Sequence, residues 1–184
     1  MLEDNITLEM IKKLNDRLIK ESNGYIRSFQ EIKTFNLGEI NNIIVDNHRK
    51  KCGIYFFEIK FNGLVLDEEE IYDRLKIEWE KDLRVHIPKI IKNMVSKNDF
   101  SNEDTWIPFY LGKSNDMGVR FEEHLIGKSS TSGLRLSEIK SGLFLNASYR
   151  LNAIELDGYK GDNYWVVTKI EKILREKMSP ICGR

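Results

Sequence analysis

Cysteine and proline are scarce in this chain of 184 residues, which has two cysteines and three prolines. Cys52 and Cys182 lie far apart and outside any C-x-x-C pattern, and the three histidines are scattered. We therefore expect neither a disulfide framework nor a structural zinc site. With 12 glycines and so few prolines, collagen-like and low-complexity chains are excluded as well.

An excess of charge is also absent, because 29 Lys and Arg residues balance 29 Asp and Glu residues. No global positive charge attracts nucleic acid, so any charged binding site must be local. No apolar run approaches the roughly 18 residues of a membrane helix. Residues 1–5 lack the basic start of a secretory signal. We expect a cytoplasmic protein without a membrane partner.

The chain does contain 41% hydrophobic and 10% aromatic residues, which is enough to bury one core at this length. Three segments have the β-branched and aromatic composition of strands, at residues 53–61, 106–112 and 151–156. Asn62-Gly63 and Asp157-Gly158 supply turn signals after the first and the third. We predict three strands there.

Helical periodicity predicts an amphipathic packing arm over residues 7–21, after a Thr7 cap, and further helices over 117–126 and 164–178. The stretch 22–50 has no firm assignment.

A long segment, residues 64–104, separates the first two predicted strands. Residues 67–82 are rich in acids, whereas residues 83–97 contain basic residues and no acid. Apolar spacing predicts one helix in each part, broken near Pro88.

Five side chains in these elements have the chemistry of a catalytic site. Tyr55 and Tyr110 lie on the first two strands, and Arg120 and His124 stand four apart on one helix face. Glu171 interrupts an apolar helical stripe. Each also has an ordinary structural interpretation. The tyrosines are then core aromatics, Arg120 and His124 a surface pair, and Glu171 a partner of a neighbouring base, Lys172 or Arg175.

The order of these residues resembles the motifs of the GIY-YIG nuclease superfamily. The resemblance covers residues 53–63 and 107–183. Its motifs are Gly53-Ile54-Tyr55, Tyr110-Leu111-Gly112-Lys113-Ser114, Arg120-x-x-x-His124, and Glu171 with Pro180 nine residues later. Two features depart from the family. Gly183 stands where many members carry asparagine, and residues 64–104 are inserted between the tyrosine motifs.

The resemblance implies an α/β (α+β) fold, with a small central, mainly antiparallel three-stranded sheet flanked by helices. Residues 1–184 would form a single domain, with residues 1–50 as an N-terminal extension and 64–104 as a helical insertion. It also implies an endonuclease that hydrolyses DNA phosphodiesters with one Mg²⁺ or Mn²⁺ per active site and no nucleotide cofactor. A restriction, defence or mobile-element role is the context we expect.

The resemblance also assigns roles to the residues of the site. Glu171 would hold the metal, and Arg120 would face the scissile phosphate. Tyr55, Tyr110, Lys113 and His124 would line the water side. A tyrosine is a poor base at its ordinary pKa near 10, so either nearby positive charge lowers that pKa or His124 takes the proton. The sequence does not choose between them.

Double-stranded DNA is the expected partner, bound by a homodimer because one compact site cuts one strand at a time. Lys89 and Lys92 lie in the acid-free segment and are candidate contacts to the duplex. Further candidates surround the second motif and the hydroxyl-rich loop: Ser114, Lys128, Ser130, Thr131 and Arg135. The lysines and hydroxyls have a second interpretation, as solvated surface. Competing functions are a nucleic-acid-binding module that does not cut, and a purely structural domain.

Overall fold

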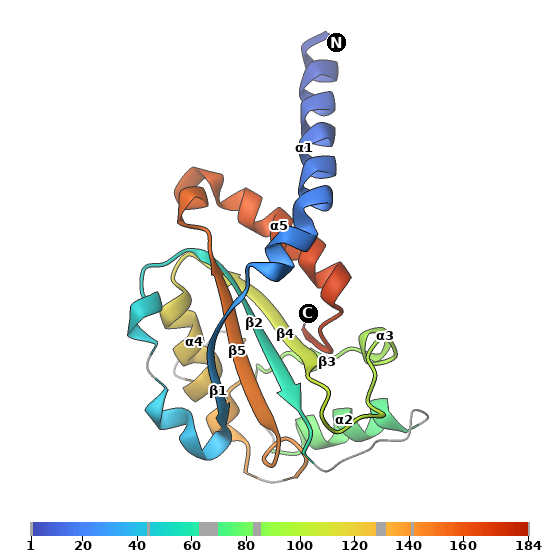
Figure 1. Cartoon of the computed structure of the whole chain (residues 1–184), viewed down its shortest axis with the longest axis vertical. Coiled ribbons are helices and arrows are strands. Elements are labelled where there is room, and N and C mark those ends of the chain that lie inside the picture. The colour runs from blue at the N-terminus through green and yellow to red at the C-terminus, as the bar shows by residue number, and fades with distance from the viewer. Residues whose placement is uncertain are drawn as a thin grey trace.

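A six-stranded mixed sheet forms the centre of this α+β fold (Figure 1). The structure is a computed structural model, and it describes residues 2–43, 45–62, 70–82, 86–127, 132–140 and 142–183. The strands run in the order β1-β5-β2-β4-β6-β3 across the sheet. Their bounds are β1 Gln30–Asn36, β2 Gly53–Lys60, β3 Lys89–Ile90, β4 Ile107–Ser114, β5 Ser148–Glu155 and β6 Cys182–Gly183.

The predicted three-stranded sheet is therefore too small, although its three strands are present as β2, β4 and β5. These strands pair antiparallel around β2, and β4 pairs parallel to β6. β1 was missed because its sequence, QEIKTFN, is polar and mostly exposed at the edge of the sheet. β3 and β6 have two residues each, and no periodicity is visible over so short a length.

The predicted helices 117–126 and 164–178 are confirmed as α4 (Met117–Ile126) and α5 (Tyr164–Met178). The arm predicted over 7–21 is longer, since α1 runs over Leu2–Arg27 and Thr7 lies inside it. Short 3₁₀ helices complete the described chain, at Leu37–Asn42, Asp46–His48, Leu136–Glu138, Asp157–Tyr159 and Gly161–Asn163.

Of the two helices predicted in the insertion, the first is α2 (Ile71–Glu80), and residues 63–69 before it lie outside the described part. The second is wrong. It is replaced by β3 and by one turn, α3 (Lys92–Val95). Lys89 and Ile90 pair with β6, and the indole of Trp79 donates a hydrogen bond to the Pro88 carbonyl at 2.8 Å. These tertiary bonds hold the segment extended against its helical periodicity.

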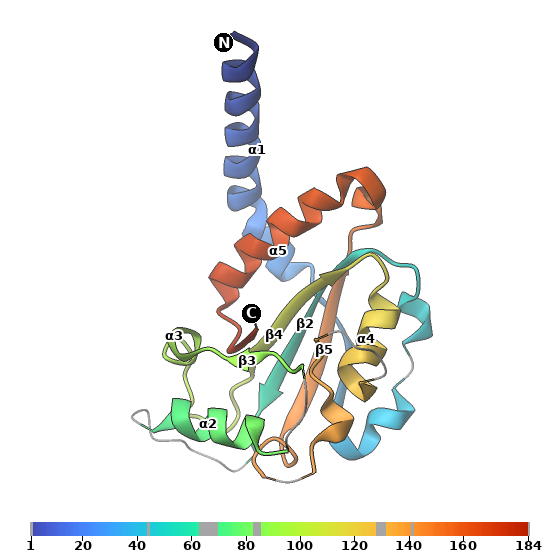
Figure 2. The ribbon, with the colours of Figure 1, turned by 180° about the vertical axis from the view of Figure 1, so that it is seen from behind.

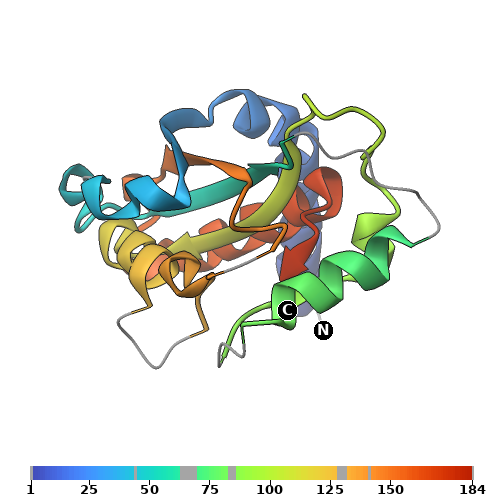
Figure 3. The same ribbon diagram turned by 90° about the horizontal axis from the view of Figure 1, so that it is seen from below.

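The two faces of the sheet carry separate cores. On one face α1 and α5 cover Ile54, Phe56 and Leu111. On the other, α2 and α4 cover Tyr55, Phe57 and neighbouring aromatics (Figures 2 and 3). The N-terminal half of α1 projects beyond both layers (Figure 1). Within the described residues, no helix has the length and the apolar composition needed to cross a membrane.

Candidate active site

A cavity of about 340 Å³ lies at the edge of β4, between α4 and α5. Five of the six predicted catalytic residues line it, and they come from β2, β4, α4 and α5. The lining residues are Tyr55, Tyr110, Gly112, Lys113, Arg120, Glu171 and Arg175. One edge of β4 pairs with β2 along its length, whereas among the described residues its other edge pairs with β6 only at Tyr110. Side chains from both faces of the sheet meet around this open edge.

Two motif glycines are required by close packing. Tyr55 lies opposite Gly112 in the β2–β4 ladder, and a Cβ on Gly112 would collide with the hydroxyl group of Tyr55. A Cβ on Gly53 would collide with the carbonyl oxygen of Ile154, on the neighbouring strand. Gly112 therefore leaves room for the phenol of Tyr55 beside β4, and Gly53 lets β2 lie close to β5.

A β-bulge brings Tyr110 to the same face of the sheet as Tyr55. The register shifts between Phe57↔Tyr110 and Glu58↔Pro108, which leaves Phe109 as an extra residue on β4. Side chains of a regular strand alternate, but a bulge sends consecutive side chains to one face. Phe109 is buried in the aromatic core, and the Tyr110 ring stacks on Tyr55 with 6.3 Å between centroids.

His124 lies behind Tyr55 rather than in the cavity, and it is fully buried. The backbone N–H of Leu134 donates to His124 Nδ1 at 3.0 Å, so the proton of the neutral ring is on Nε2. Nε2 lies 2.9 Å from the Tyr55 hydroxyl and donates to its oxygen. Burial, and then the charge of Arg120, lower the pKa of His124 well below its ordinary value. His124 is thus a neutral donor to Tyr55.

Tyr55 is buried, and its oxygen accepts a second hydrogen bond from Arg120 Nε at 3.2 Å. Burial raises the pKa of Tyr55 well above 10, and Tyr110 raises it further, while Arg120 opposes this. The hydrogen bonds from His124 and Arg120 favour the phenolate, but the cost of burying a charge is larger. Tyr55 is therefore protonated in this structure.

Arg120 projects from α4, a helix that begins where the Asp116 carboxylate accepts from the Val119 N–H at 3.1 Å. Its other two nitrogens donate to the Glu123 carboxylate and to the Ser132 carbonyl. Sequence reasoning missed Glu123, although its spacing of three from Arg120 on one helix is the signal of such a pair.

Glu171 is buried on α5 and is ion-paired on both sides. Arg175 donates to its Oε1 from Nε at 2.9 Å and from a terminal nitrogen at 2.6 Å. Lys113 Nζ lies 3.5 Å from Oε2. The structural interpretation of Glu171, pairing with Arg175, is thus observed together with its place in the cavity. Arg175 itself was not predicted as a site residue.

Glu171 is the cavity's only carboxylate among the described residues. No described group of three or more His, Cys, Asp or Glu side chains could enclose a metal. A single hard oxygen ligand still fits Mg²⁺, which keeps several waters and takes substrate phosphate oxygens as further ligands. Oε2 is the oxygen that suits this role, because Arg175 already occupies Oε1.

The predicted nucleic-acid contacts do not gather in the cavity. Lys89 and Lys92 are exposed, and they line a second cavity, of about 560 Å³, with Ser132 and Gly183. The two cavities adjoin, because Ser132 accepts from Arg120 and a Cβ on Gly183 would lie 2.7 Å from Arg175.

The remaining predicted contacts are engaged within the protein or lie outside the described part. The Ser114 hydroxyl bonds to the Asp116 backbone in the turn before α4. Arg135 is largely buried and pairs with Glu138 at 3.0 Å. Lys128, Ser130 and Thr131 lie outside the described residues.

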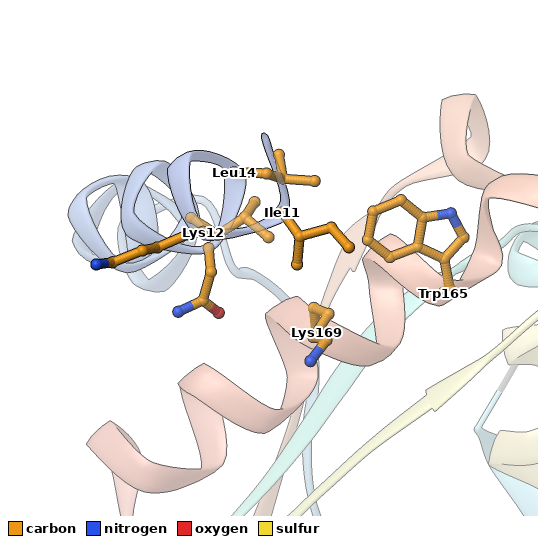
Figure 4. Close-up of a pocket in the computed structure, with 7 residues that line it drawn as sticks. Ile11, Lys12, Leu14, Trp165 and Lys169 are labelled. Atoms are coloured by element: carbon orange, nitrogen blue, oxygen red, sulfur yellow. The ribbon is translucent and has the colours of Figure 1, made fainter. Parts of the chain in front are cut away.

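A third cavity, of about 460 Å³, lies between α1 and α5 and is mainly apolar (Figure 4). Ile11 and Leu14 of α1 and Trp165 of α5 line it together with Leu18, and Lys12 and Lys169 stand at its rim. None of the described residues that line it is an acid, a phenol or an arginine, so these residues lack the groups for phosphodiester chemistry.

The cavity at β4 therefore combines one carboxylate, two phenols and three cations. Such a set can bind a phosphate, hold one hydrated cation and position a water. Comparisons with protein-family models, with curated proteins and with solved structures give no match to this chain.

Proposed function

We propose that this chain is a divalent-metal-dependent DNA endonuclease of the type that its motifs resemble, the GIY-YIG nucleases. The observation that carries the proposal is the cavity itself. It gathers side chains from four elements that lie far apart along the chain: Tyr55, Tyr110, Lys113, Arg120 and Glu171. Core aromatics and a solvated surface pair would have no reason to converge on one open edge.

Arg120 would bind the scissile phosphate. Its guanidinium has five donors in a planar fork, which suits phosphate oxygens. In the described structure it is occupied by Glu123 and Ser132, so phosphate binding requires that at least the Glu123 contact be exchanged.

Tyr55 is better placed than His124 to receive the proton of the attacking water, provided that it has first released its own proton to solvent through Tyr110 and become a phenolate. The positive charge of Arg120 and of a bound metal ion would favour that loss. Nδ1 of His124 faces the Leu134 N–H, and its other nitrogen already carries a proton, so the ring has no free acceptor. Its role is to donate to the Tyr55 oxygen and so to stabilise a phenolate. Glu171 would hold a Mg²⁺ or Mn²⁺ ion, which supplies Lewis-acid activation and further positive charge when bound.

Double-stranded DNA is the proposed substrate, and two copies of this chain would cut its two strands. We infer that the second copy packs on the α1–α5 face, defined by Met10, Ile11, Ile19 and Trp165. These side chains are 67%, 57%, 46% and 50% exposed. The nearby charges Glu9 and Lys13 pair within α1 at 3.3 Å, and Lys12 and Lys169 stand at the rim, so the centre of this face suits an apolar partner. A second α1 supplies one.

A nucleic-acid-binding module that does not cut is the alternative. The observation that favours it is the double ion pair of Glu171, because a carboxylate held by Arg175 and Lys113 must give up one contact to ligate a metal.

The deciding experiment is incubation of supercoiled plasmid with the protein in Mg²⁺ or Mn²⁺, with a chelator control. Glu171→Gln should abolish cleavage and leave plasmid binding in chelator intact, because the amide keeps the shape but loses the anionic ligand. Glu176→Gln, an exposed glutamate of the same helix, is the matched control and should cut normally. Binding without cleavage by the unchanged protein would support the alternative function instead.

A further inference from the structure

Arg175 does more than form an ion pair within its own helix, because it also bonds to the neighbouring strand. From α5 it donates twice to Glu171 Oε1 and once to the backbone carbonyl of Leu111 on β4. That carbonyl lies on the open edge of β4, where the partner strand has ended. Arg175 therefore ties Glu171 to the strand that carries Tyr110 and Lys113.

We infer that Arg175 is a positioning residue, which fixes the Glu171 carboxylate so that Oε2 is the oxygen offered to the metal. The inference rests on the proposed function. Both donors of Arg175 converge on Oε1, while Oε2 has only the 3.5 Å contact with Lys113. A glutamate side chain is flexible, and without this clamp its two oxygens would exchange places.

Lysine would not replace Arg175. The clamp needs two nitrogens on one carboxylate oxygen and a bond to a carbonyl from the same group, which a planar guanidinium provides and a single ammonium does not. Lysine would keep the charge beside Glu171 but lose the geometry.

Gly183 on β6 leaves room for the guanidinium. A Cβ at this position would lie 2.7 Å from one terminal nitrogen of Arg175 and 3.5 Å from the Ile91 side chain. That nitrogen is buried and has no hydrogen-bond partner among the residues that the structure describes. Leu111 and Glu171 hold the other two nitrogens of the guanidinium. A methyl group at position 183 would therefore displace the guanidinium from Glu171 Oε1.

The proposal predicts that metal binding and turnover respond in opposite ways to loss of Arg175. Arg175→Ala should bind Mn²⁺ in the absence of DNA at least as tightly as the unchanged protein, since a cation beside the ligand is gone. Its turnover at saturating Mn²⁺ should fall by about 10 to 100-fold, as for loss of an outer contact to a metal ligand. Free Mn²⁺ is measured by electron paramagnetic resonance, and turnover by plasmid cleavage.

Three variants complete the test. Arg175→Lys should restore thermal stability but not turnover. Gly183→Ala should lower turnover with Arg175 still present, and it serves if Arg175→Ala does not fold. Lys172→Ala, an exposed cation on the same helix, is the control.

Unchanged turnover in Arg175→Ala, or full recovery in the lysine variant, would overturn the positioning role while the nuclease activity stands. If the unchanged protein neither binds Mn²⁺ nor cuts, the proposed function fails, and the inference fails with it.

Discussion

The Tyr55 oxygen links the other side chains of the site, since it accepts hydrogen bonds from both His124 and Arg120. Because both of these groups donate, the phenol must give its own proton elsewhere, toward the side where Tyr110 lies. Buried His124 therefore has to stay neutral for the arrangement to persist.

Acidification should destabilise the fold through His124. The folded-state pKa of His124 lies well below the unfolded value of about 6.5, so its contribution is fully present above that value and is lost as pH falls toward the folded pKa. Below about pH 6.5 the free energy of unfolding should decline by up to about 1.4 kcal/mol per pH unit from this group alone. Chemical denaturation at several pH values measures the slope.

His124→Gln serves as the comparison, because glutamine keeps a donor for Tyr55 without a titrating ring. Its slope over the same range should be shallower by this amount. Equal slopes in the two proteins would show that His124 is not the group that titrates.

At this scale the sequence predicted which side chains gather in the cavity better than it predicted the partners that hold them. Tyr110 and Arg120 were found from motif order, and both line the cavity. Glu123 and Arg175 were not assigned to the site. Their importance depends on the open edge of β4 and on which donor reaches which oxygen, and neither is encoded in local spacing.

At the scale of elements, the insertion shows where periodicity misleads. Ile87, Ile90 and Ile91 have helical spacing, yet the segment is held extended by β6 and by the Trp79–Pro88 hydrogen bond. α4 and α5 were predicted with correct bounds, because each carries its own cap and stop signals. β3 and β6 have two residues each and are defined by their pairing with other strands, so no local sequence pattern predicts them.

Substitution of Lys89 and Lys92 tests whether the inserted segment contacts DNA. Both line the cavity next to Arg120 and Arg175, so a DNA strand leaving the active site would pass them. Lys89→Ala combined with Lys92→Ala should weaken binding and reduce the slope of log K against log salt by about 1.8, which is 0.9 for each lost phosphate contact. Turnover at saturating DNA should not change.

Fluorescence anisotropy with a labelled duplex over a range of salt concentrations gives this slope. Lys97→Ala, another exposed lysine of the segment that does not line the cavity, is the control. An unaltered slope in the double variant would assign Lys89 and Lys92 to ordinary solvated surface.

At the scale of the whole molecule, half of the large exposed apolar side chains of the described residues belong to the α1–α5 face. Helix α1 itself projects from the rest of the fold (Figure 1). Replacing Ile11 by Asp and Trp165 by Ser should prevent a second copy from packing there. Plasmid nicking should persist, while linear product should form only after nicked circles accumulate. Sedimentation on a short duplex should shift from two copies to one.

Ile77→Ser is the matched control, because Ile77 is 66% exposed on the distant helix α2. A one-to-one complex of the unchanged protein, with double-strand cleavage strictly proportional to enzyme concentration, would rule out the dimer.

The ion pairs of the cavity also set a lower limit on substrate size. Arg120 is held by Glu123, and Lys113 is held by Glu171, so the two cations proposed to meet phosphate start out occupied. A polymer brings neighbouring phosphates whose binding energy, gained away from the reacting bond, helps to open these pairs. A mononucleotide or a small chromogenic diester brings none. We therefore expect such compounds to pass through the site without hydrolysis, which would spare the nucleotides of a cell that contains this protein.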